Sequence, residues 1–115
     1  MPRVLSSLWV GAYLRRCQVE GAFAAVVRRG AGEAGAIFVK INRLDGTVDL
    51  YGPAPQAMVE PGEGIDRQFE CLGARMEEAA ANARLAREAS FDPDLWIVEI
   101  EDRAGRAFLD LAPGA

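Results

Sequence analysis

Hydrophobic residues recur at helical spacing near the start of the chain. From Leu8 to about Glu20 they are separated by three or four positions, and Gly21 follows the last of them. Ser6 and Ser7 precede this segment, where a hydroxyl can accept a hydrogen bond from the free amides of a first helical turn. Glycine is common just beyond a helix end. The pattern predicts a helix that ends at Gly21 and packs through one face.

A second segment with helical character runs from Ala74 to about Ala89 and is rich in alanine. Its apolar residues, spaced by three and four positions, predict a buried stripe. The stripe consists of Leu72, Met76, Ala79, Ala83 and Ala86. Alanine side chains on such a stripe would allow the helix to approach a sheet closely.

The other hydrophobic segments are short and β-branched, which is typical of strands. Residues 23–29 and 36–44 are of this kind, and the second segment alternates with a period of two. Asp45-Gly46 then predicts a two-residue hairpin turn into a strand over residues 47–51. We expect these three strands to form an antiparallel meander.

Further strands are expected over residues 67–72, 95–101 and 107–111, with the second of them central in the sheet. The proline- and glycine-rich segment Gly52–Gly64 is predicted to be either a binding loop or a connector. The predicted order is α-β-β-β-(β)-α-β-β. We therefore expect an α+β fold in a single domain, residues 1–115, with two helices packed on a mainly antiparallel sheet.

Gly30, Gly32 and Gly35 spell G-x-G-x-x-G, the spacing of a dinucleotide-binding loop. Such a loop leads from a strand into a helix, whose N-terminus holds the pyrophosphate. Here the residues after Gly35 have strand character, and the Asp-Gly turn comes too soon to leave room for a crossover helix. We interpret the motif as a hairpin loop and predict no bound cofactor.

A two-residue turn would place Asn42 opposite Asp49 and Lys40 opposite Tyr51. One face of the hairpin would then carry four polar side chains, Lys40, Asn42, Asp49 and Tyr51. This group could bind a ligand, or Lys40 could act with Asp49 and Tyr51 in catalysis. The alternative is a solvated face with a weak cross-strand ion pair.

Carboxylates gather toward the C-terminal end, and such oxygen ligands suit magnesium or calcium. They are Asp92, Asp94, Glu99, Glu101 and Asp102. Pairing with Arg103 and Arg106, or solvation, is the simpler interpretation. We therefore predict no metal site.

The chain contains no histidine, which excludes a Ser-His-Asp or Cys-His catalytic set within it. Its two cysteines, Cys17 and Cys71, are too few for a disulfide scaffold and fall in apolar patterns. These features favour a protein without catalytic activity. The short apolar segments predict no membrane partner, and the absence of a secretory signal pattern predicts a cytoplasmic location.

Charge is distributed unevenly along the chain. The net charge is −4, yet the first part is basic and the remainder acidic. A basic surface could bind nucleic acid through Arg15, Arg16, Arg28, Arg29 and Arg43. The acidic part must fold against the basic part, so mutual neutralisation is favoured, and nucleic acid is the weakest of the partners considered.

Three segments carry a resemblance to a known family. They are LWVGAYLRRCQVEGAFAAVVRRG (8–30), AGAIFVKINRLDGTVDLYGPAP (34–55) and DPDLWIVEIEDRAGR (92–106). Together they resemble the alphaproteobacterial domain-of-unknown-function family numbered 1491. The resemblance implies a self-contained, cytoplasmic bacterial domain, and it implies no activity, substrate or catalytic residue.

Three functional hypotheses follow from the sequence. The first is a binding or protein-interaction module that recognises a protein or a small molecule through the hairpin's polar face and the Gly52–Gly64 loop, and that could form a homodimer. The second is a small enzyme or ligand-binding protein that uses Lys40, Asp49 and Tyr51. The third is a nucleic-acid binder that uses the arginines of the basic part.

Overall fold

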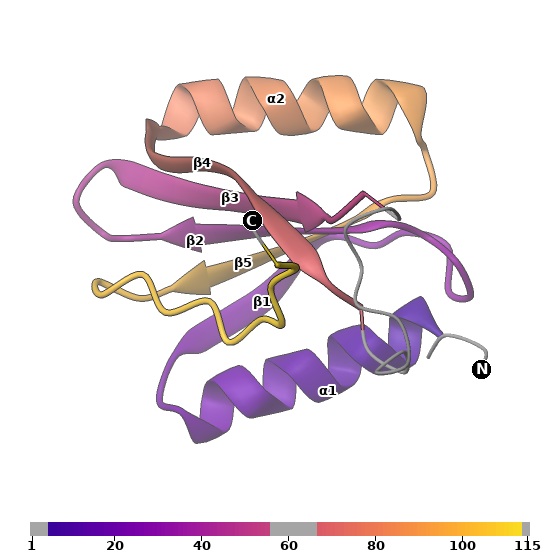
Figure 1. The fold of residues 1–115 in the computed structure, drawn as a ribbon, viewed down its shortest axis with the longest axis horizontal. Coiled ribbons are helices and arrows are strands. Elements are labelled where there is room, and N and C mark those ends of the chain that lie inside the picture. Colours follow the sequence, from indigo (N-terminus) through magenta and orange to yellow (C-terminus); the bar gives the residue numbers. More distant parts are fainter. Residues whose placement is uncertain (1–4, 56–66, 114–115) are drawn as a thin grey trace.

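Two helices and five strands make up the computed structural model over residues 5–55 and 67–113, which are the residues it describes. In chain order they are α1 (Ser6–Val19), β1 (Phe23–Arg28), β2 (Ile37–Asn42), β3 (Thr47–Pro53), β4 (Phe69–Glu77), α2 (Glu78–Phe91) and β5 (Trp96–Glu101). Most of the predicted Gly52–Gly64 loop lies outside the described residues. The helices cover opposite faces of one sheet (Figure 1).

The sheet has the strand order β1-β5-β2-β3-β4. β2 and β5 are parallel, and the other neighbours are antiparallel. The predicted α+β class and three-stranded meander are confirmed, but the meander is β2-β3-β4 and does not include β1. β5 separates β1 from β2 because its side chains are buried on both faces, which an inner strand allows.

The glycine-rich segment between β1 and β2 crosses the start of β5. Ala31 N donates to Asp94 O at 2.9 Å, and Trp96 Nε1 donates to Ala31 O at 2.7 Å. A Cβ atom at Gly30 or Gly35 would clash with Asp94 O, whereas one at Gly32 would meet nothing closer than 3.8 Å. The prediction of a hairpin loop was therefore wrong. Glycine is needed here for close backbone packing, and a strand follows Gly35 as expected.

The turn between β2 and β3 is longer than the two-residue turn predicted from Asp45-Gly46. Asn42 lies opposite Val48 and Lys40 opposite Leu50, one position away from the predicted register. Polar side chains stabilise the longer turn: Asn42 Oδ1 accepts from Leu44 N, and Asp45 Oδ1 accepts from Thr47 N. A shift of one residue moves every side chain of the shifted strand to the opposite face of the sheet.

The helix boundaries differ from those predicted by periodicity alone. α1 includes Ser6 and has no side-chain N-cap, because Ser6 Oγ donates to Gly35 O instead. Gly21 adopts a φ of 83°, as expected just beyond the helix. α2 begins at Glu78, since β4 continues to Glu77 as the partner of β3.

Packing on α2 and at the C-terminal end also corrects the sequence analysis. The predicted alanine stripe was wrong: Ala81 and Leu85 are the buried residues of α2, whereas Ala79, Ala83 and Ala86 are exposed. The segment 107–111 is not a strand, although Leu111 forms an isolated β-bridge with Phe69.

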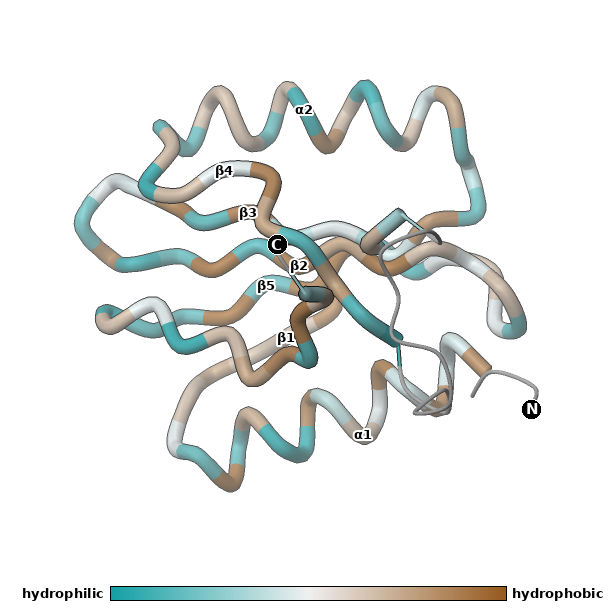
Figure 2. Tube along the Cα trace, viewed as in Figure 1, coloured by the Kyte–Doolittle hydropathy of each residue, from teal (hydrophilic) through white to brown (hydrophobic). Residues whose placement is uncertain are grey.

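Two hydrophobic clusters lie on the two faces of the sheet. The first joins α1 to the odd-numbered residues of β2, including Val39 and Ile41, and the second joins α2 to the even-numbered Phe38. Hydrophobic and hydrophilic residues alternate along the strands and helices, as Figure 2 shows. This alternation assigns each side chain of β2 to the α1 face or the α2 face.

Candidate functional site

The four polar residues predicted to share a face of the hairpin do not form one group. Lys40 and Asn42 belong to the α2 face, with Phe38. Asp49 and Tyr51 lie opposite Ile41 and Val39, so they belong to the α1 face. The predicted pairing was wrong because it assumed the shorter turn.

Lys40 occupies a polar cluster between the sheet and α2. Its Nζ donates to Glu78 Oε2 at 2.8 Å and to Asn82 Oδ1 at 2.9 Å, and it lies 3.6 Å from Glu99 Oε1. Asn42 Nδ2 donates to the other oxygen of Glu99 at 3.3 Å. With three polar partners around an ammonium that is 6% exposed, the cluster joins α2 to the sheet.

Asp49 is buried on the opposite face, where its carboxylate accepts hydrogen bonds from one side chain and from one backbone amide of β4. Its Oδ2 accepts from Arg43 Nε at 3.0 Å, and its Oδ1 accepts from Arg75 N at 2.8 Å. Arg75 has a positive φ of 51°, and β4 turns there toward α2. The hydrogen bond that Arg43 donates to Asp49 raises the pKa of the Arg43 guanidinium. Burial raises the pKa of Tyr51, which packs with the α1-face cluster.

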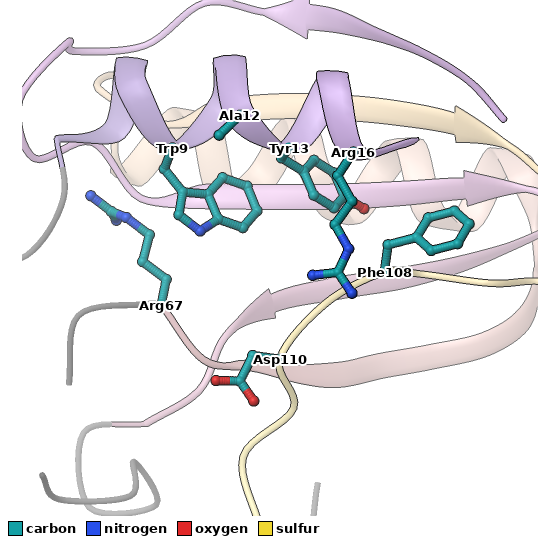
Figure 3. A pocket seen from close by; sticks show the side chains of 7 residues that line it. All are labelled: Trp9, Ala12, Tyr13, Arg16, Arg67, Phe108 and Asp110. Carbon is teal, nitrogen blue, oxygen red and sulfur yellow. The ribbon is translucent and has the colours of Figure 1, made fainter. Parts of the chain in front are cut away.

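A hollow of about 170 Å³ opens beside α1. Figure 3 shows Trp9, Tyr13 and Arg16 reaching toward it from the helix, with Asp110 and Phe108 from the C-terminal segment. The Trp9 and Tyr13 rings stack with centroids 4.8 Å apart. Tyr13 Oη donates to Ala107 O, and burial raises the pKa of Tyr13. The sequence analysis missed this hollow because its two sides are far apart in the chain.

The arginines proposed for nucleic acid do not form one surface. Arg15 and Arg16 are exposed on α1, whereas Arg28 lines a groove on the α2 face. Arg29 lies over the Trp96 ring, and Arg43 pairs with Asp49. Arg28 also donates hydrogen bonds to Pro93 O and Leu95 O, so three of the five arginines make contacts within the chain and the surface charge is dispersed.

The acidic residues and the cysteines are also separated in the fold. Asp92 and Asp94 precede β5, whereas Glu101 is its last residue and Asp102 follows it. Over the residues that the structure describes, no group of three or more His, Cys, Asp or Glu side chains could hold a metal ion. Cys17 is buried, and its burial raises the pKa of the thiol, whereas Cys71 is exposed.

Among the residues that the structure describes, β1 forms one edge of the sheet, pairs only with β5, and exposes apolar side chains. Phe23 is 65% exposed and Val27 is 60% exposed. Val27 is the extra residue of a bulge, since Val26 lies opposite Val98 and Arg28 lies opposite Ile97. The sequence analysis missed this edge because it placed β1 inside a meander.

An open groove of about 410 Å³ runs between this edge and α2. Leu85, Ala86 and Ala89 line it from the helix, and Val27 and Ile97 line it from the sheet. The polar side chains at its border are Arg28, Lys40, Asn82 and Glu99. An apolar side chain presented along the edge of β1 would therefore meet an apolar surface.

The opposite edge, β4, carries features that prevent strand addition. Phe69 N donates to Asp110 O and Ala112 N donates to Phe69 O, so the C-terminal segment already pairs with its start. Farther along, β4 carries the charged Glu70, Arg75 and Glu77, and its register with β3 shifts twice. Charges, bulges and covering segments are the usual means of protecting an edge.

Residues 4–110 match the model of a protein family whose description reads "Protein of unknown function (DUF1491)". The chain belongs to this family. Its alphaproteobacterial relatives include a DUF1491 protein from Caulobacter crescentus CB15, whose crystal structure is 37% identical, with a TM-score of 0.77 and coverage of 95% of this chain and 96% of that one. Protein Atu0922 from A. tumefaciens, solved in solution, is 42% identical, with a TM-score of 0.76 and coverage of 96% and 97%.

An NMR structure of a DUF1491 protein from C. crescentus CB15 is 40% identical, with a TM-score of 0.74 and 93% coverage of both chains. No curated protein matches the chain. The family and the fold of this chain are thus established. Across the described ranges, neither helix has the length and apolarity needed to cross a bilayer.

Proposed function

We propose that this DUF1491 domain is a protein-interaction module that receives an extended segment of a partner along the free edge of β1. The observation that carries the proposal is the difference between the two edges of the sheet. β4 is paired at its start with the C-terminal segment and carries three charged residues, Glu70, Arg75 and Glu77. β1 carries one charged residue, Arg28, exposes Phe23 and Val27, and has one paired side among the described residues. An edge strand with free amides and carbonyls is a template for strand addition.

The groove beside β1 adds the side-chain component of such recognition. Main-chain hydrogen bonds supply much of the affinity when a strand is added, and pockets for alternate side chains supply specificity. The groove between Val27, Ile97 and Leu85 lies on the same face of the sheet as Phe23. A bound strand would therefore place every second side chain over an apolar surface.

The geometry gives less support to the other hypotheses. Lys40 is held by Glu78 and Asn82, and it lies on the opposite face from Asp49 and Tyr51, so we assign no catalytic step to this set. Nucleic-acid binding through the five arginines remains a prediction. Binding of labelled RNA or DNA at low salt would test it, with a steep loss of affinity expected as salt rises.

Photo-crosslinking within the bacterium tests the interaction proposal. Benzoylphenylalanine replaces Phe23 at the β1 edge, and in a control strain it replaces Leu111, which is 44% exposed beside the opposite edge. The proposal predicts an adduct of defined mass from position 23 and none of that mass from position 111. Equal or absent crosslinking at the two positions would refute it.

The hollow beside α1 supports a second candidate function, the binding of a small planar anion. Trp9 forms an aromatic wall of the hollow. The Arg16 guanidinium makes no ion pair with the described residues, so it could pair with a bound anion. Benzoate and indole-3-acetate serve as probes in a thermal-shift assay. Stabilisation of the wild type that is lost in Arg16→Gln but kept in Arg15→Gln would support this site, and no stabilisation by either probe would exclude it for aromatic carboxylates.

A further inference from the structure

We infer that the strand received at the β1 edge is β1 of a second copy of this chain. The two copies then form a homodimer with a two-fold axis. The inference rests on the proposed function and specifies its partner. A two-fold interface uses the same surface on both copies, so that surface must complement itself. Three properties of β1 meet this condition: its bulge, its charge distribution and the position of Phe23.

The bulge at Val27 determines which register a self-pair can adopt. Phe23, Ala25 and Arg28 lie on the α2 face, because their partners Glu101, Glu99 and Ile97 do, whereas Ala24 and Val26 lie on the α1 face. Residues directly opposite one another in an antiparallel pair must share a face. An antiparallel pair with Ala25 opposite Ala25 of the second copy satisfies this rule at every paired position, provided that Val27 stays unpaired as the bulge residue.

This register places Ala24 opposite Val26 of the second copy and Phe23 opposite its Arg28. Every residue of Phe23–Arg28 except the bulged Val27 is then paired. Moving the two-fold axis to Ala24 or Val26 leaves one end of the strand without a partner. Small alanine side chains at the axis also permit close approach of the two strands.

Charge favours the antiparallel arrangement. Two arginines, Arg28 and Arg29, stand at the C-terminal end of β1, and Glu101 lies beside Phe23 at its N-terminal end. Antiparallel pairing brings the basic end of each copy to the acidic end of the other. The added strand is two strand spacings from Glu101, about 10 Å, so this attraction acts at the limit of screening at physiological salt.

Phe23 gains a contact in this arrangement that the monomer lacks. Phe23 would lie opposite Arg28 of the second copy. There it would reach the mouth of the second copy's groove, which Val27, Ile97 and Leu85 line. The guanidinium of Arg28 is fixed beside it by hydrogen bonds from Nη1 to Pro93 O at 3.0 Å and to Leu95 O at 2.7 Å. Each copy thus offers both an exposed aromatic ring and the apolar groove and cation that can receive it.

Disulfide trapping tests the register in the full chain. The exposed Cys71 is first replaced by serine, while the buried Cys17 is kept. Strands in a pair bring opposite Cα atoms to about 4.5–5.5 Å, which a disulfide can span. Under mild oxidation, Ala25→Cys should form a covalent dimer, and Ala24→Cys and Val26→Cys should form one only when mixed.

The controls separate this inference from the proposed function. Covalent dimers of Ala24→Cys alone, or none from Ala25→Cys in protein shown to be folded by circular dichroism, would overturn the self-pair. A photo-adduct at position 23 of a mass other than twice the chain would also overturn it, yet would support strand addition by another protein. Absence of any specific adduct at position 23 would refute both.

Discussion

Ser6 Oγ donates a 2.6 Å hydrogen bond to the carbonyl oxygen of Gly35 and accepts one of 2.8 Å from Arg67 Nη2. This buried hydroxyl connects the start of α1 to the loop that crosses β5. The hydroxyl therefore stabilises tertiary contacts, although a serine just ahead of a helical pattern usually caps the helix.

Removing this hydroxyl should destabilise the domain more than removing its neighbour. Ser6→Ala leaves a buried carbonyl without its donor and is expected to cost about 1–3 kcal/mol in the free energy of unfolding. Ser7→Ala is the matched control, because the Ser7 backbone bonds to Gly32 O but its hydroxyl has no hydrogen bond in the described structure. Urea denaturation measures both, and equal losses would contradict the assigned role.

The glycines of the crossing loop should respond to substitution according to position. Gly30→Ala would bring a Cβ against the carbonyl oxygens of Asp94 and Leu95, and overpacking of this kind costs about 1–3 kcal/mol or more. Gly32→Ala should cost under about 1 kcal/mol, since the nearest atom is the Ser7 hydroxyl at 3.8 Å. Thermal unfolding compares the two variants. A stable Gly30→Ala protein would show that the crossing geometry is wrong.

Much of the fold was predictable from the sequence because local patterns determine single elements. The alternation over β2 and the apolar β5 correctly indicated strands, and Gly21 correctly marked the end of α1. The pairing of strands was not predictable in the same way, because β1 and β5 are joined by contacts over more than seventy positions of the chain. Nothing local in the β1 sequence distinguishes an edge strand from an inner one.

The predicted grouping of Lys40, Asn42, Asp49 and Tyr51 on one face was wrong for an equally specific reason. The side chains of Asn42 and Asp45 stabilise a longer turn than Asp45-Gly46 indicates, and this one-residue difference separates Lys40 from Asp49 and Tyr51. The edge of β1 and the hollow beside Trp9 depend on tertiary placement, so neither has a motif. The only available signal was that Phe23–Val27 is apolar on both faces.

The polar cluster under α2 lies at the border of the groove and should contribute to stability more than to binding, because strand addition depends mainly on the β1 backbone. Lys40→Met removes the cation between Glu78 and Glu99 and is expected to cost about 1–2 kcal/mol, less than for a fully buried pair because both carboxylates are partly exposed. Photo-crosslinking at position 23 should be unchanged. Loss of the adduct in a folded Lys40→Met protein would show that Lys40 is needed for binding.

Acid should remove a stabilising contribution from Asp102. Hydrogen bonds from Arg106 lower the pKa of Asp102 below its ordinary value of 3.8. A carboxyl with a lowered folded pKa stabilises the fold fully above its unfolded pKa, and that contribution is lost as pH falls from about 4 through the folded pKa. The wild type should therefore be more stable than Asp102→Asn at pH 7, and the difference should shrink below pH 4.

The exposed Glu33 provides the comparison for this titration, since its side chain makes no ion pair in the described structure. Glu33→Gln should follow the wild type at every pH. Chemical denaturation at a series of pH values measures the differences. A gap between wild type and Asp102→Asn that widens toward low pH would contradict the assignment.

Sedimentation equilibrium tests the self-pairing of β1 most directly. Phe23→Arg keeps a favourable intrachain neighbour in Glu101 but sets a second cation against Arg28 of the other copy, whereas Leu111→Arg adds the same charge beside the opposite edge. The wild type and Leu111→Arg should form dimers with similar dissociation constants. Phe23→Arg should weaken dimerisation by roughly a hundredfold or more, because each of two rings loses about 1.5–3 kcal/mol of apolar burial. A wild type that stays monomeric up to about 1 mM, or a Phe23→Arg protein that dimerises like the wild type, would contradict the account.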